Sequence, residues 1–373
     1  MARAVFTFRW AAEEALRIVG EVLPLDLEPG SEGRLALTRR VPRGPALLIS
    51  PFNFPLNLVA HKVAPAIAVG APYVHKPASC ARRVADELGR LVVESGWPAE
   101  AMAVAKLGGD AAEALVKDER FGLLSFTGSG EVGWRLKSLA GKKAVLLELG
   151  GNAGVFVDEG ADLELAAARC AWGGNAYAGQ VCIKVQRIFV LDKVYARFKA
   201  LLLDKVAGLK LGDPWDEKTD VGPLITQAEA ERVESWVEEA VSAGAKTLCG
   251  GRRKGDLFEP TILEDVPERC RVSCDEVFGP VTTLAPVPSA EEGLRRMAQS
   301  RYGLQAGIFT KDLSAVLRFW ERLPVGGLIV NDVPTFRSDA MPYGGTKDSG
   351  IGREGVRYSM EEFTERRTLV LRS

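Results

Sequence analysis

Residues 123–133 read LLSFTGSGEVG, and this stretch decides the class of fold. An apolar run of strand length, 123–127, leads into a glycine-rich turn, and a helical pattern begins at Val132. The glycines fit the G-x-G-x-x-G spacing of a dinucleotide-binding turn, in which backbone N–H groups at a helix N-terminus attract a pyrophosphate. The motif is weak alone, because glycine-rich strand–helix turns also form for packing. The residues expected at a phosphate are Gly128, Ser129 and Gly133.

The same alternation of strand and helix patterns extends over residues 44–150. Five strands separated by helices indicate a parallel sheet covered on both faces, which is a doubly wound α/β domain. A second α/β series follows from residue 153 to about residue 331. In the first series the expected strands are 46–50, 73–76, 101–105, 123–127 and 144–149, and the expected helices are 61–69, 82–95, 111–117 and 132–139. In the second, the clearest strands are 187–190 and 327–330, and the clearest helices are 194–209 and 228–243.

Two segments fit neither series. Residues 24–40 have the pattern of a hairpin with a Pro-Gly-Ser turn, and residues 367–371 have the pattern of a lone strand. Because a lone strand needs a partner, we expect the two segments to pair in a small arm that reaches another subunit.

The composition is that of an ordinary globular protein. The chain has 373 residues, 47% of them hydrophobic and 26% charged, which is enough for two or three domains with a large core. A formal charge of −1 gives no reason to expect a nucleic acid or an anionic membrane as partner. No apolar run has the length of a membrane-spanning helix, and residues 11–19 form an amphipathic helical pattern rather than a signal peptide.

Cysteine usage indicates the compartment. Six scattered cysteines lack the spacing of a disulfide framework, which favours a reducing environment, so we expect a soluble cytoplasmic protein. Cys270 and Cys274 have no second Cys or His pair to complete a zinc site, so no metal is expected.

A nucleophile and a base stand out among the remaining residues. Cys182 follows a glycine-rich stretch that leaves room for a substrate, 34 residues after Glu148. Since His61 and His75 are the only histidines, a Cys/His dyad or a Ser/His/Asp triad is poorly supported. A thiol and a carboxylate instead indicate a thioester that an activated water hydrolyses. Glu148 also lies 20 residues after Gly128, where a dinucleotide-binding turn carries its ribose-binding acid, so both roles stay open at this point.

Other polar residues lie where strands end. Asn53 stands in a loop fixed by two prolines, and its amide can stabilise an oxyanion by roughly 3–4 kcal/mol. An Asx turn is the structural alternative. Lys76 ends a strand at the ligand-binding edge of the sheet, where it either holds a ribose hydroxyl or phosphate or is a solvated loop lysine. Glu276 and Phe278 precede a strand, and the turn-rich segments 341–345 and 349–354 are expected to line a cleft.

Taken together, these segments resemble the aldehyde dehydrogenase superfamily, in its NAD(P)-dependent, non-phosphorylating form. Seven motifs occur in the family's order along the whole chain: SPFNFPLN, HKPAS, FTGSGEVG, LELGGN, GQVCIKVQR, EVFGPV and MPYGGTKDSGIGREG. The resemblance implies oxidation of an aldehyde to a carboxylic acid with NAD or NADP, in a homodimer or homotetramer.

The resemblance also implies a role for each motif. Cys182 attacks the aldehyde carbon, and the oxyanion is held by the Asn53 side chain and the Cys182 N–H. Hydride transfer leaves a thioester, and Glu148 activates the water that releases the acid, so Glu148 is the base and not the ribose acid. Lys62 and Glu354 match a proton relay. The implied cofactor contacts are Ser50, Pro51, Phe52, Lys76, Ser79, Gly128, Ser129, Gly133, Glu276 and Phe278, and the implied substrate contacts are Phe54, Val181 and Arg337.

Three positions bear on the subclass. Glu148 predicts release of a free acid rather than transfer to coenzyme A. Ser79 stands where NAD-strict members often carry Glu, and the missing carboxylate leaves NADP open. Val181 replaces the arginine that members acting on glyceraldehyde 3-phosphate tend to carry, although Arg337 could still bind an anionic substrate tail. The C-terminal motif resembles members that act on lactaldehyde and similar short aliphatic or hydroxylated aldehydes.

The chain differs from the family in its short N-terminal lead-in. We therefore expect a cofactor domain, 1–23 and 41–150, that is N-terminally incomplete, a catalytic domain, 151–344, and a bridging or oligomerisation arm, 24–40 and 360–373. A truncated, non-catalytic cofactor-binding or structural relative is the alternative that this departure leaves open.

Overall fold

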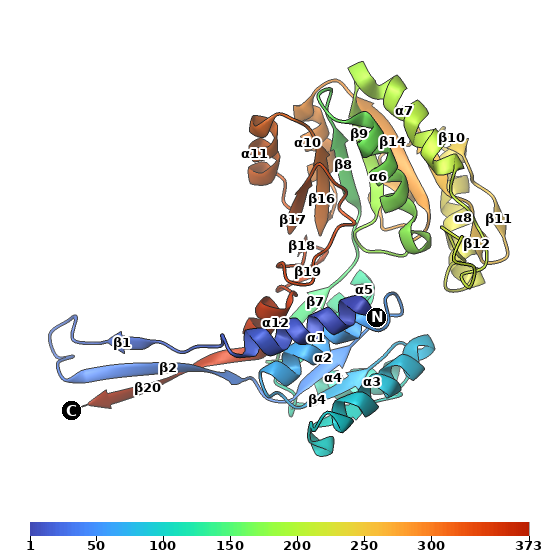
Figure 1. Ribbon diagram of the computed structural model, residues 1–373. Helices are drawn as coiled ribbons and strands as arrows, with labels where there is room; N and C mark the ends of the chain where they lie inside the picture. The colour runs from blue at the N-terminus through green and yellow to red at the C-terminus, as the bar shows by residue number, and fades with distance from the viewer. Residues whose placement is uncertain (373) are drawn as a thin grey trace. The chain divides into compact units, whose positions relative to one another are not determined.

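The computed structural model describes residues 1–372, which fold as two compact units. Unit 1 contains Met1–Glu148, Ser338–Tyr343 and the chain from Ile351, and unit 2 contains Leu149–Arg337 and Gly344–Gly350. Each unit has a mainly parallel sheet with helices packed against it (Figure 1). The predicted α/β class is confirmed.

The sheet of unit 1 contains all five predicted strands of the first series. They lie in the order β7-β6-β3-β4-β5, and every neighbouring pair is parallel. The strands are β3 (Ala46–Ile49), β4 (Tyr73–Lys76), β5 (Met102–Val104), β6 (Leu123–Thr127) and β7 (Ala144–Glu148). The helices of the unit are α1 (Ala2–Ala15), α2 (Asn57–Ala68), α3 (Arg82–Glu94), α4 (Gly109–Lys117), α5 (Gly130–Leu139) and α12 (Val356–Phe363).

The N-terminal helix differs from its expected bounds. It begins at Ala2 and ends at Ala15, whereas the amphipathic pattern placed it at 11–19. Its buried positions, Ala4, Thr7, Ala11 and Glu14, recur every three or four residues and face α2 and α12. Packing of this stripe, rather than the charge pattern near residue 13, fixes where the helix lies.

Ser338–Tyr343 belongs to unit 1, whereas the sequence placed all of 151–344 in one domain. The buried carboxylate of Asp339 explains the difference. It accepts hydrogen bonds from Arg3 Nη2 at 2.6 Å and pairs with His61 Nε2 at 2.8 Å, so α1 and α2 hold this segment. Burial alone would raise the pKa of Asp339, but the bonds from His61 and Arg3 hold that pKa well below its usual range.

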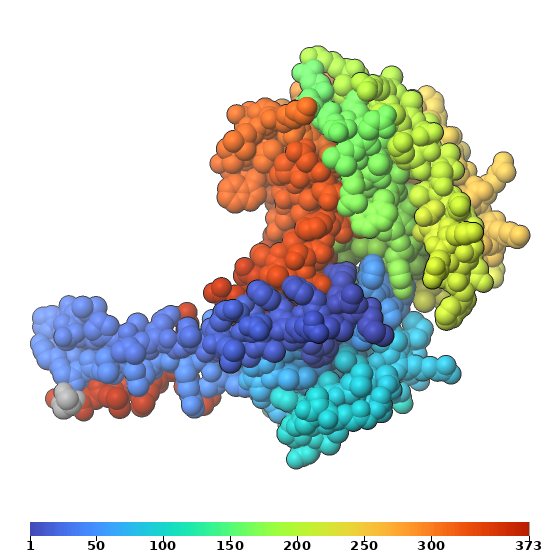
Figure 2. Space-filling model, in the orientation of Figure 1, coloured from blue at the N-terminus to red at the C-terminus, as the bar shows by residue number. Residues whose placement is uncertain are grey.

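The predicted arm is present as a three-stranded antiparallel sheet within unit 1. β1 (Val22–Pro24) and β2 (Arg34–Pro42) form the hairpin, and β2 pairs with β20 (Thr364–Arg372) along its whole length. The pairing of the two segments is thus confirmed, with a longer C-terminal strand than 367–371. Figure 2 shows β2 and β20, in blue and red, lying side by side along the arm.

The sheet of unit 2 has seven strands in the order β10-β13-β14-β9-β8-β16-β17, and only β10 is antiparallel to its neighbour. The strands are β8 (Ala153–Val157), β9 (Val185–Leu191), β10 (Lys246–Cys249), β13 (Thr261–Glu264), β14 (Val281–Val287), β16 (Gln305–Phe309) and β17 (Gly327–Val330). The helices are α6 (Leu163–Asn175), α7 (Asp192–Ala207), α8 (Gln227–Ser242), α9 (Arg271–Cys274), α10 (Ala290–Ala298) and α11 (Leu313–Arg322).

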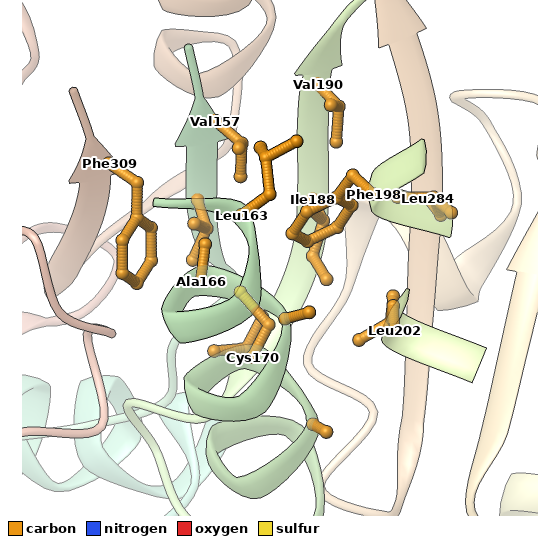
Figure 3. Packing of buried hydrophobic residues seen from close by; sticks show 14 of the residues in the cluster. Val157, Leu163, Ala166, Cys170, Ile188, Val190, Phe198, Leu202, Leu284 and Phe309 are labelled. Carbon is orange, nitrogen blue, oxygen red and sulfur yellow. The ribbon is translucent and has the colours of Figure 1, made fainter. Parts of the chain in front are cut away.

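Strand alternation explains how two helical layers cover this sheet. Val155 and Ile188 face one side, where they pack with α6 and α7 in the cluster that Figure 3 shows. Phe156 and Phe189, the next residues along β8 and β9, face the other side and pack with α10 and α11. Burial on both faces makes β8 and the second half of β9, residues 188–191, continuous apolar runs.

The remaining elements are short. They are η1 (Ser79–Ala81), η2 (Ala99–Ala101), η3 (Ala176–Gly179), β11 (Arg253–Lys254), β12 (Leu257–Phe258), β15 (Tyr302–Gly303), β18 (Thr346–Lys347) and β19 (Gly350–Ile351). Among residues 1–372, no helix combines the length and the apolar character that crossing a membrane requires.

Candidate active site

In unit 1, the ends of β3 and β4 are bonded together around Ser50. The Ser50 N–H donates to the Lys76 carbonyl at 3.2 Å, and the Ser50 carbonyl accepts from the Ala78 N–H at 3.0 Å. The Ser50 hydroxyl also contacts His75 Nε2 at 2.8 Å. Burial lowers the pKa of His75 to about 4, with a further lowering from the charges of Lys62 and Lys76, so the ring is neutral near pH 7. Two of the predicted cofactor residues, Ser50 and Lys76, are therefore neighbours, and His75 fixes the first of them.

The loop after Ser50 places Asn53 in the interior of unit 1. Asn53 is 5% exposed. Phe54 follows it with φ 48°, a left-handed conformation that costs on the order of 1 kcal/mol for a non-glycine residue. The Phe54 carbonyl then accepts from the Leu58 N–H at 3.0 Å, which starts α2. The strained turn is fixed by this hydrogen bond at the start of α2. It therefore holds the Asn53 side-chain amide rigidly, as an oxyanion donor requires.

Lys62 and Glu354, which the resemblance pairs, are in contact in unit 1. Lys62 Nζ lies 3.1 Å from Glu354 Oε1 and 2.9 Å from Ser125 Oγ, and all three residues are almost completely buried. Glu354 is itself fixed by an antiparallel bridge, in which its N–H donates to the Tyr343 carbonyl and its carbonyl accepts from the Tyr343 N–H. This bridge joins the two turn-rich segments that the sequence analysis singled out.

Glu148 ends β7 beside the glycine-rich turn. Its residue partner across the parallel ladder is Thr127, and its carbonyl accepts from the Gly128 N–H at 3.1 Å. The Glu148 side chain is 3% exposed. The predicted base and the predicted phosphate turn are therefore neighbours at one edge of the sheet of unit 1.

The turn itself has the features that a pyrophosphate requires. α5 is ten residues long and begins at Gly130, after the exposed N-cap residue Ser129. A Cβ at Gly128 would lie 2.6 Å from the Phe126 ring, so any side chain here would displace that buried ring. Backbone N–H groups at the start of α5, together with Lys76 at the end of β4, suit the phosphates and ribose of NAD or NADP.

In unit 2, the stretch before Cys182 is strained and closely packed. Tyr177, Ala178 and Gly179 all have positive φ, at 55°, 55° and 71°. A Cβ at Gly179 would lie 2.2 Å from the Gly279 carbonyl oxygen, so the backbone of this stretch lies directly on the turn after Phe278. Cys182 keeps partial exposure. The structure thus brings together the backbone segments that carry Cys182 and Phe278.

Glu276 and the glycines after Glu148 complete this cluster of unit 2. The Gly151 N–H donates to Glu276 Oε1 at 3.0 Å, and a Cβ at Gly150 would lie 2.5 Å from the same carboxylate. A Cβ at Gly151 would lie 2.1 Å from the Cys182 carbonyl oxygen. Burial raises the pKa of Glu276 to about 7, against the opposing effects of the Gly151 N–H and the charges of Arg232 and Lys184.

The segment that carries Arg337 lies against the Cys182 segment within unit 2. The Thr335 hydroxyl is 3.0 Å from the Gly173 carbonyl oxygen and 3.1 Å from that of Ile183, the residue after Cys182. Gln305 Nε2 donates to the Phe336 carbonyl at 3.0 Å. Arg337 is therefore held on a fixed stretch of chain and is itself partly buried.

The predicted site residues divide between the units as follows. Unit 1 carries Ser50, Pro51, Phe52, Asn53, Phe54, Lys62, Lys76, Ser79, Gly128, Ser129, Gly133, Glu148 and Glu354, and unit 2 carries Val181, Cys182, Glu276, Phe278 and Arg337.

Some structural supports of the site were not anticipated. His75 braces Ser50, and Ser125 binds Lys62. Asn152 and Gln186 donate to the Asp275 carbonyl at 2.9 and 2.6 Å and so hold the chain just before Glu276. Each of these is a polar residue inside or beside an apolar strand, which is the signal in the sequence that could have identified them.

Known proteins are similar to this chain over nearly its whole length. The sequence model of the Aldehyde dehydrogenase family matches residues 1–369. A 3-sulfolactaldehyde dehydrogenase of Priestia aryabhattai is 46% identical over 372 residues, which are 99% of this chain and 78% of that protein.

Two solved structures are similar over the full length of this chain. Aldehyde dehydrogenase 21 of Physcomitrella patens, in complex with the reaction product succinate, has a TM-score of 0.97 and 45% identity over 100% of this chain and 78% of that one. Glyceraldehyde-3-phosphate dehydrogenase GapN of Methanocaldococcus jannaschii, complexed with NADP, has a TM-score of 0.95 and 41% identity over 100% of this chain and 81% of that one.

The chain therefore belongs to the aldehyde dehydrogenase family. It is an NAD(P)-dependent oxidoreductase, and the resemblance read from its motifs is confirmed.

Proposed function

We propose that the protein oxidises a short 2-hydroxy aldehyde to the carboxylic acid through a thioester on Cys182. The observation that carries the proposal is the packing around Cys182 in unit 2. Its approach segment lies on the turn after Phe278, and its carbonyl lies against Gly151, whose N–H holds Glu276. Cys182 is partly exposed and is held in this frame. Cys170 differs from it, because Cys170 is buried and this burial raises the pKa of its thiol far above the usual range.

The first half of the proposed reaction forms the covalent intermediate. The Cys182 thiolate adds to the aldehyde carbon, and the resulting oxyanion is held by the Asn53 side-chain amide and the Cys182 N–H. When bound, NAD(P)+ supplies the hydride acceptor for that carbon. The C–O bond then closes to a carbonyl, and Cys182 carries the acyl group as a thioester.

The second half releases the acid. Glu148 removes a proton from a water molecule as that water attacks the thioester carbon, and the C–S bond breaks to return the Cys182 thiolate. The buried pair of Lys62 and Glu354 takes up the proton that Glu148 must lose before the next turnover. Their contact at 3.1 Å supports this role.

The proposed cofactor contacts lie at the ends of strands in unit 1 and on the turn of unit 2 that carries Glu276 and Phe278. In unit 1, Lys76 binds the adenosine ribose and the start of α5 binds the pyrophosphate, with Ser79 facing the 2′ position. Ser79 is exposed and carries no charge, so a 2′-phosphate meets no repulsion from this residue. The other proposed contacts are Ser50, Pro51, Phe52, Gly128, Ser129 and Gly133 in unit 1, and Glu276 and Phe278 in unit 2.

Replacement of Ser79 by glutamate is expected to lower kcat/KM for NADP by about tenfold to a hundredfold, because like charges placed together cost several kcal/mol. Oxidation with NAD should change much less, so NAD serves as the internal control. Initial rates with each cofactor at saturating aldehyde measure the effect. An equal loss of kcat/KM with both cofactors would show that Ser79 does not face the 2′ position.

Arg337 is the proposed partner of an acidic group on the substrate, and Phe54 and Val181 are the other two proposed substrate contacts. Each of the three similar proteins is named with a compound that carries an anionic group. These compounds are 3-sulfolactaldehyde, succinate and glyceraldehyde 3-phosphate. Two of them are aldehydes with a hydroxyl group on the second carbon, as lactaldehyde is. Val181 has no charge, whereas Arg337 is a partly buried cation on a stretch of chain that lies against the Cys182 segment, and its guanidinium suits such an anion.

Oxidation of a panel of aldehydes by the wild-type protein and by Arg337→Met tests this assignment. We expect the wild-type protein to oxidise lactaldehyde and its C3-sulfonated and phosphorylated analogues. In Arg337→Met, kcat/KM should fall about tenfold to a hundredfold for the anionic aldehydes, since a hydrogen bond to a charged group contributes about 1.5–3 kcal/mol.

A matched control is Arg318→Met, which removes a half-exposed arginine from α11 in the same unit. It should leave all rates unchanged. An Arg337→Met enzyme that oxidises the anionic and the neutral aldehydes as well as the wild type would contradict the substrate assignment.

The arm is proposed to join copies of the chain in a homodimer or homotetramer. β20 is an edge strand of the arm, and its Leu369, Val370 and Leu371 are 55, 53 and 46% exposed. Consecutive apolar residues on an open strand edge are a surface that a second chain would cover.

A further inference from the structure

A buried polar cluster lies on the sheet of unit 1 between α2 and the final segment of the chain. Lys62 Nζ donates to Ser125 Oγ at 2.9 Å and to Glu354 Oε1 at 3.1 Å. Lys62 and Ser125 are 0% exposed, and Glu354 is 1% exposed. Because these three residues are shielded from bulk solvent, a proton reaches them through neighbouring polar groups or bound water.

The strand register continues this cluster toward Glu148. Ser125 and Thr127 are two residues apart on β6, so their side chains lie on the same face of the sheet. Thr127 is paired across the ladder with Glu148 on β7, and paired residues of parallel strands point to the same side. Ser125, Thr127 and Glu148 therefore form one row on the face that α2 covers.

The Thr127 hydroxyl is the next polar group of this row. Its oxygen is buried and has no hydrogen-bond partner among residues 1–372. Leaving a buried hydroxyl in that state costs about 1–3 kcal/mol, which a water molecule would recover. The Cα atoms of residues two apart on a strand are about 6.6 Å apart, and hydroxyl groups that lean toward each other along that stretch come within the roughly 5.6 Å that one water spans with two hydrogen bonds.

We propose that the hydroxyl groups of Ser125 and Thr127, with a bridging water, carry the proton from Glu148 to the pair of Lys62 and Glu354. The inference rests on the proposed thioester hydrolysis, and it adds two residues to it. Neither residue touches the substrate in this scheme, since both act through Glu148.

The proton count of the proposed step is balanced. Lys62 gives one proton to the Glu354 carboxylate and receives one from the Ser125 hydroxyl. Ser125 receives a proton from Thr127 through the water, and Thr127 receives a proton from the protonated Glu148. Each oxygen in the row gives one proton and takes one, Glu148 returns to the carboxylate, and Glu354 ends protonated.

The test measures decay of the acylated enzyme in a single turnover, by rapid quenching and intact mass, together with the hydride burst. Ser125→Ala and Thr127→Val each remove one hydroxyl from the row. Thr127→Ser keeps the hydroxyl and loses only a methyl group. Ser359→Ala is the matched control, because Ser359 is also a 0% exposed serine of unit 1, on α12.

We expect acyl-enzyme decay to slow about tenfold or more in Ser125→Ala and Thr127→Val, within the range that proton-transfer groups contribute. Thr127→Ser and Ser359→Ala should decay at close to the wild-type rate. The hydride burst should be unchanged in all four variants, and the solvent deuterium isotope effect on decay should rise in the two slow ones. A purely structural role would not produce that isotope effect.

Decay in Ser125→Ala and Thr127→Val at the rate of Ser359→Ala would overturn the relay. A Ser125→Ala protein that does not fold leaves the Thr127→Val and Thr127→Ser pair to decide. Absence of any acylated wild-type enzyme would be a different result, because it would refute the thioester itself and the relay with it.

Discussion

Replacement of Cys182 by alanine is expected to abolish aldehyde oxidation, with a loss in kcat of at least about 10⁴-fold. The proposed reaction has no other nucleophile, and the two histidines are used elsewhere. His61 bonds to Asp339 and His75 to Ser50, both within unit 1. Binding of NAD or NADP should remain, since the proposed phosphate contacts lie in the other unit, at the start of α5. Absorbance of the reduced cofactor measures turnover, and titration of tryptophan fluorescence measures binding.

The matched control is Cys249→Ala. Cys249 is a half-buried cysteine of the same unit, on β10, and burial raises the pKa of its thiol. This variant should turn over at the wild-type rate. Normal oxidation by the Cys182→Ala protein would remove the covalent mechanism, whereas loss in both variants would indicate a general effect on folding.

Replacement of Glu148 by glutamine is expected to separate the two halves of the reaction. In the proposed reaction, hydride transfer does not use Glu148, so one equivalent of reduced cofactor should form at the wild-type rate. Hydrolysis of the thioester should then slow by about 10²–10⁴-fold, the usual contribution of a general base. Stopped-flow absorbance should therefore show a burst followed by a slow steady state.

Glu264→Gln is the control for this variant. Glu264 is a 9% exposed carboxylate that bonds Lys199 at 2.7 Å in unit 2 and has no part in the proposed reaction. It should show the wild-type steady state. A Glu148→Gln enzyme with the full steady-state rate would show that another group activates the water.

The first sheet was predictable because its strands end at clear local signals. β4 ends at Lys76, just before Pro77, and β6 ends at Thr127, just before the glycine-rich turn, and both strands have the predicted bounds. The second sheet was predicted only in outline. β8 and β16 are buried on both faces, so their apolar residues do not alternate with polar ones, and periodicity cannot distinguish such strands from buried helix.

The N-terminal helix and the segment around Asp339 show a different limit. The bounds of α1 depend on packing against α2 and α12, which the charge pattern of residues 11–19 does not contain. Asp339 is bonded to His61, a residue 278 positions away. Contacts between such distant residues leave no periodic signal in the sequence.

The site was predictable to the extent that each residue type has few chemical uses. A cysteine after a glycine-rich stretch, a strand-end glutamate and a proline-fixed asparagine indicated the proposed chemistry, and the ordered motifs added the proposed cofactor contacts. The glycines of LELGGN also have a physical reason, since a Cβ at Gly150 or Gly151 would strike Glu276 or the Cys182 carbonyl. Ser125 carried no motif, because its importance lies only in its contact with Lys62.

The central claim is that oxidation proceeds through a thioester on Cys182, and the most direct test is the mass of that intermediate. Glu148→Gln protein is mixed with NADP and lactaldehyde or 3-sulfolactaldehyde, quenched in acid and analysed by intact mass and peptide mapping. The account predicts an acyl adduct on Cys182 that forms together with one reduced cofactor per site. Reduced cofactor and free acid without any adduct on Cys182 would contradict it.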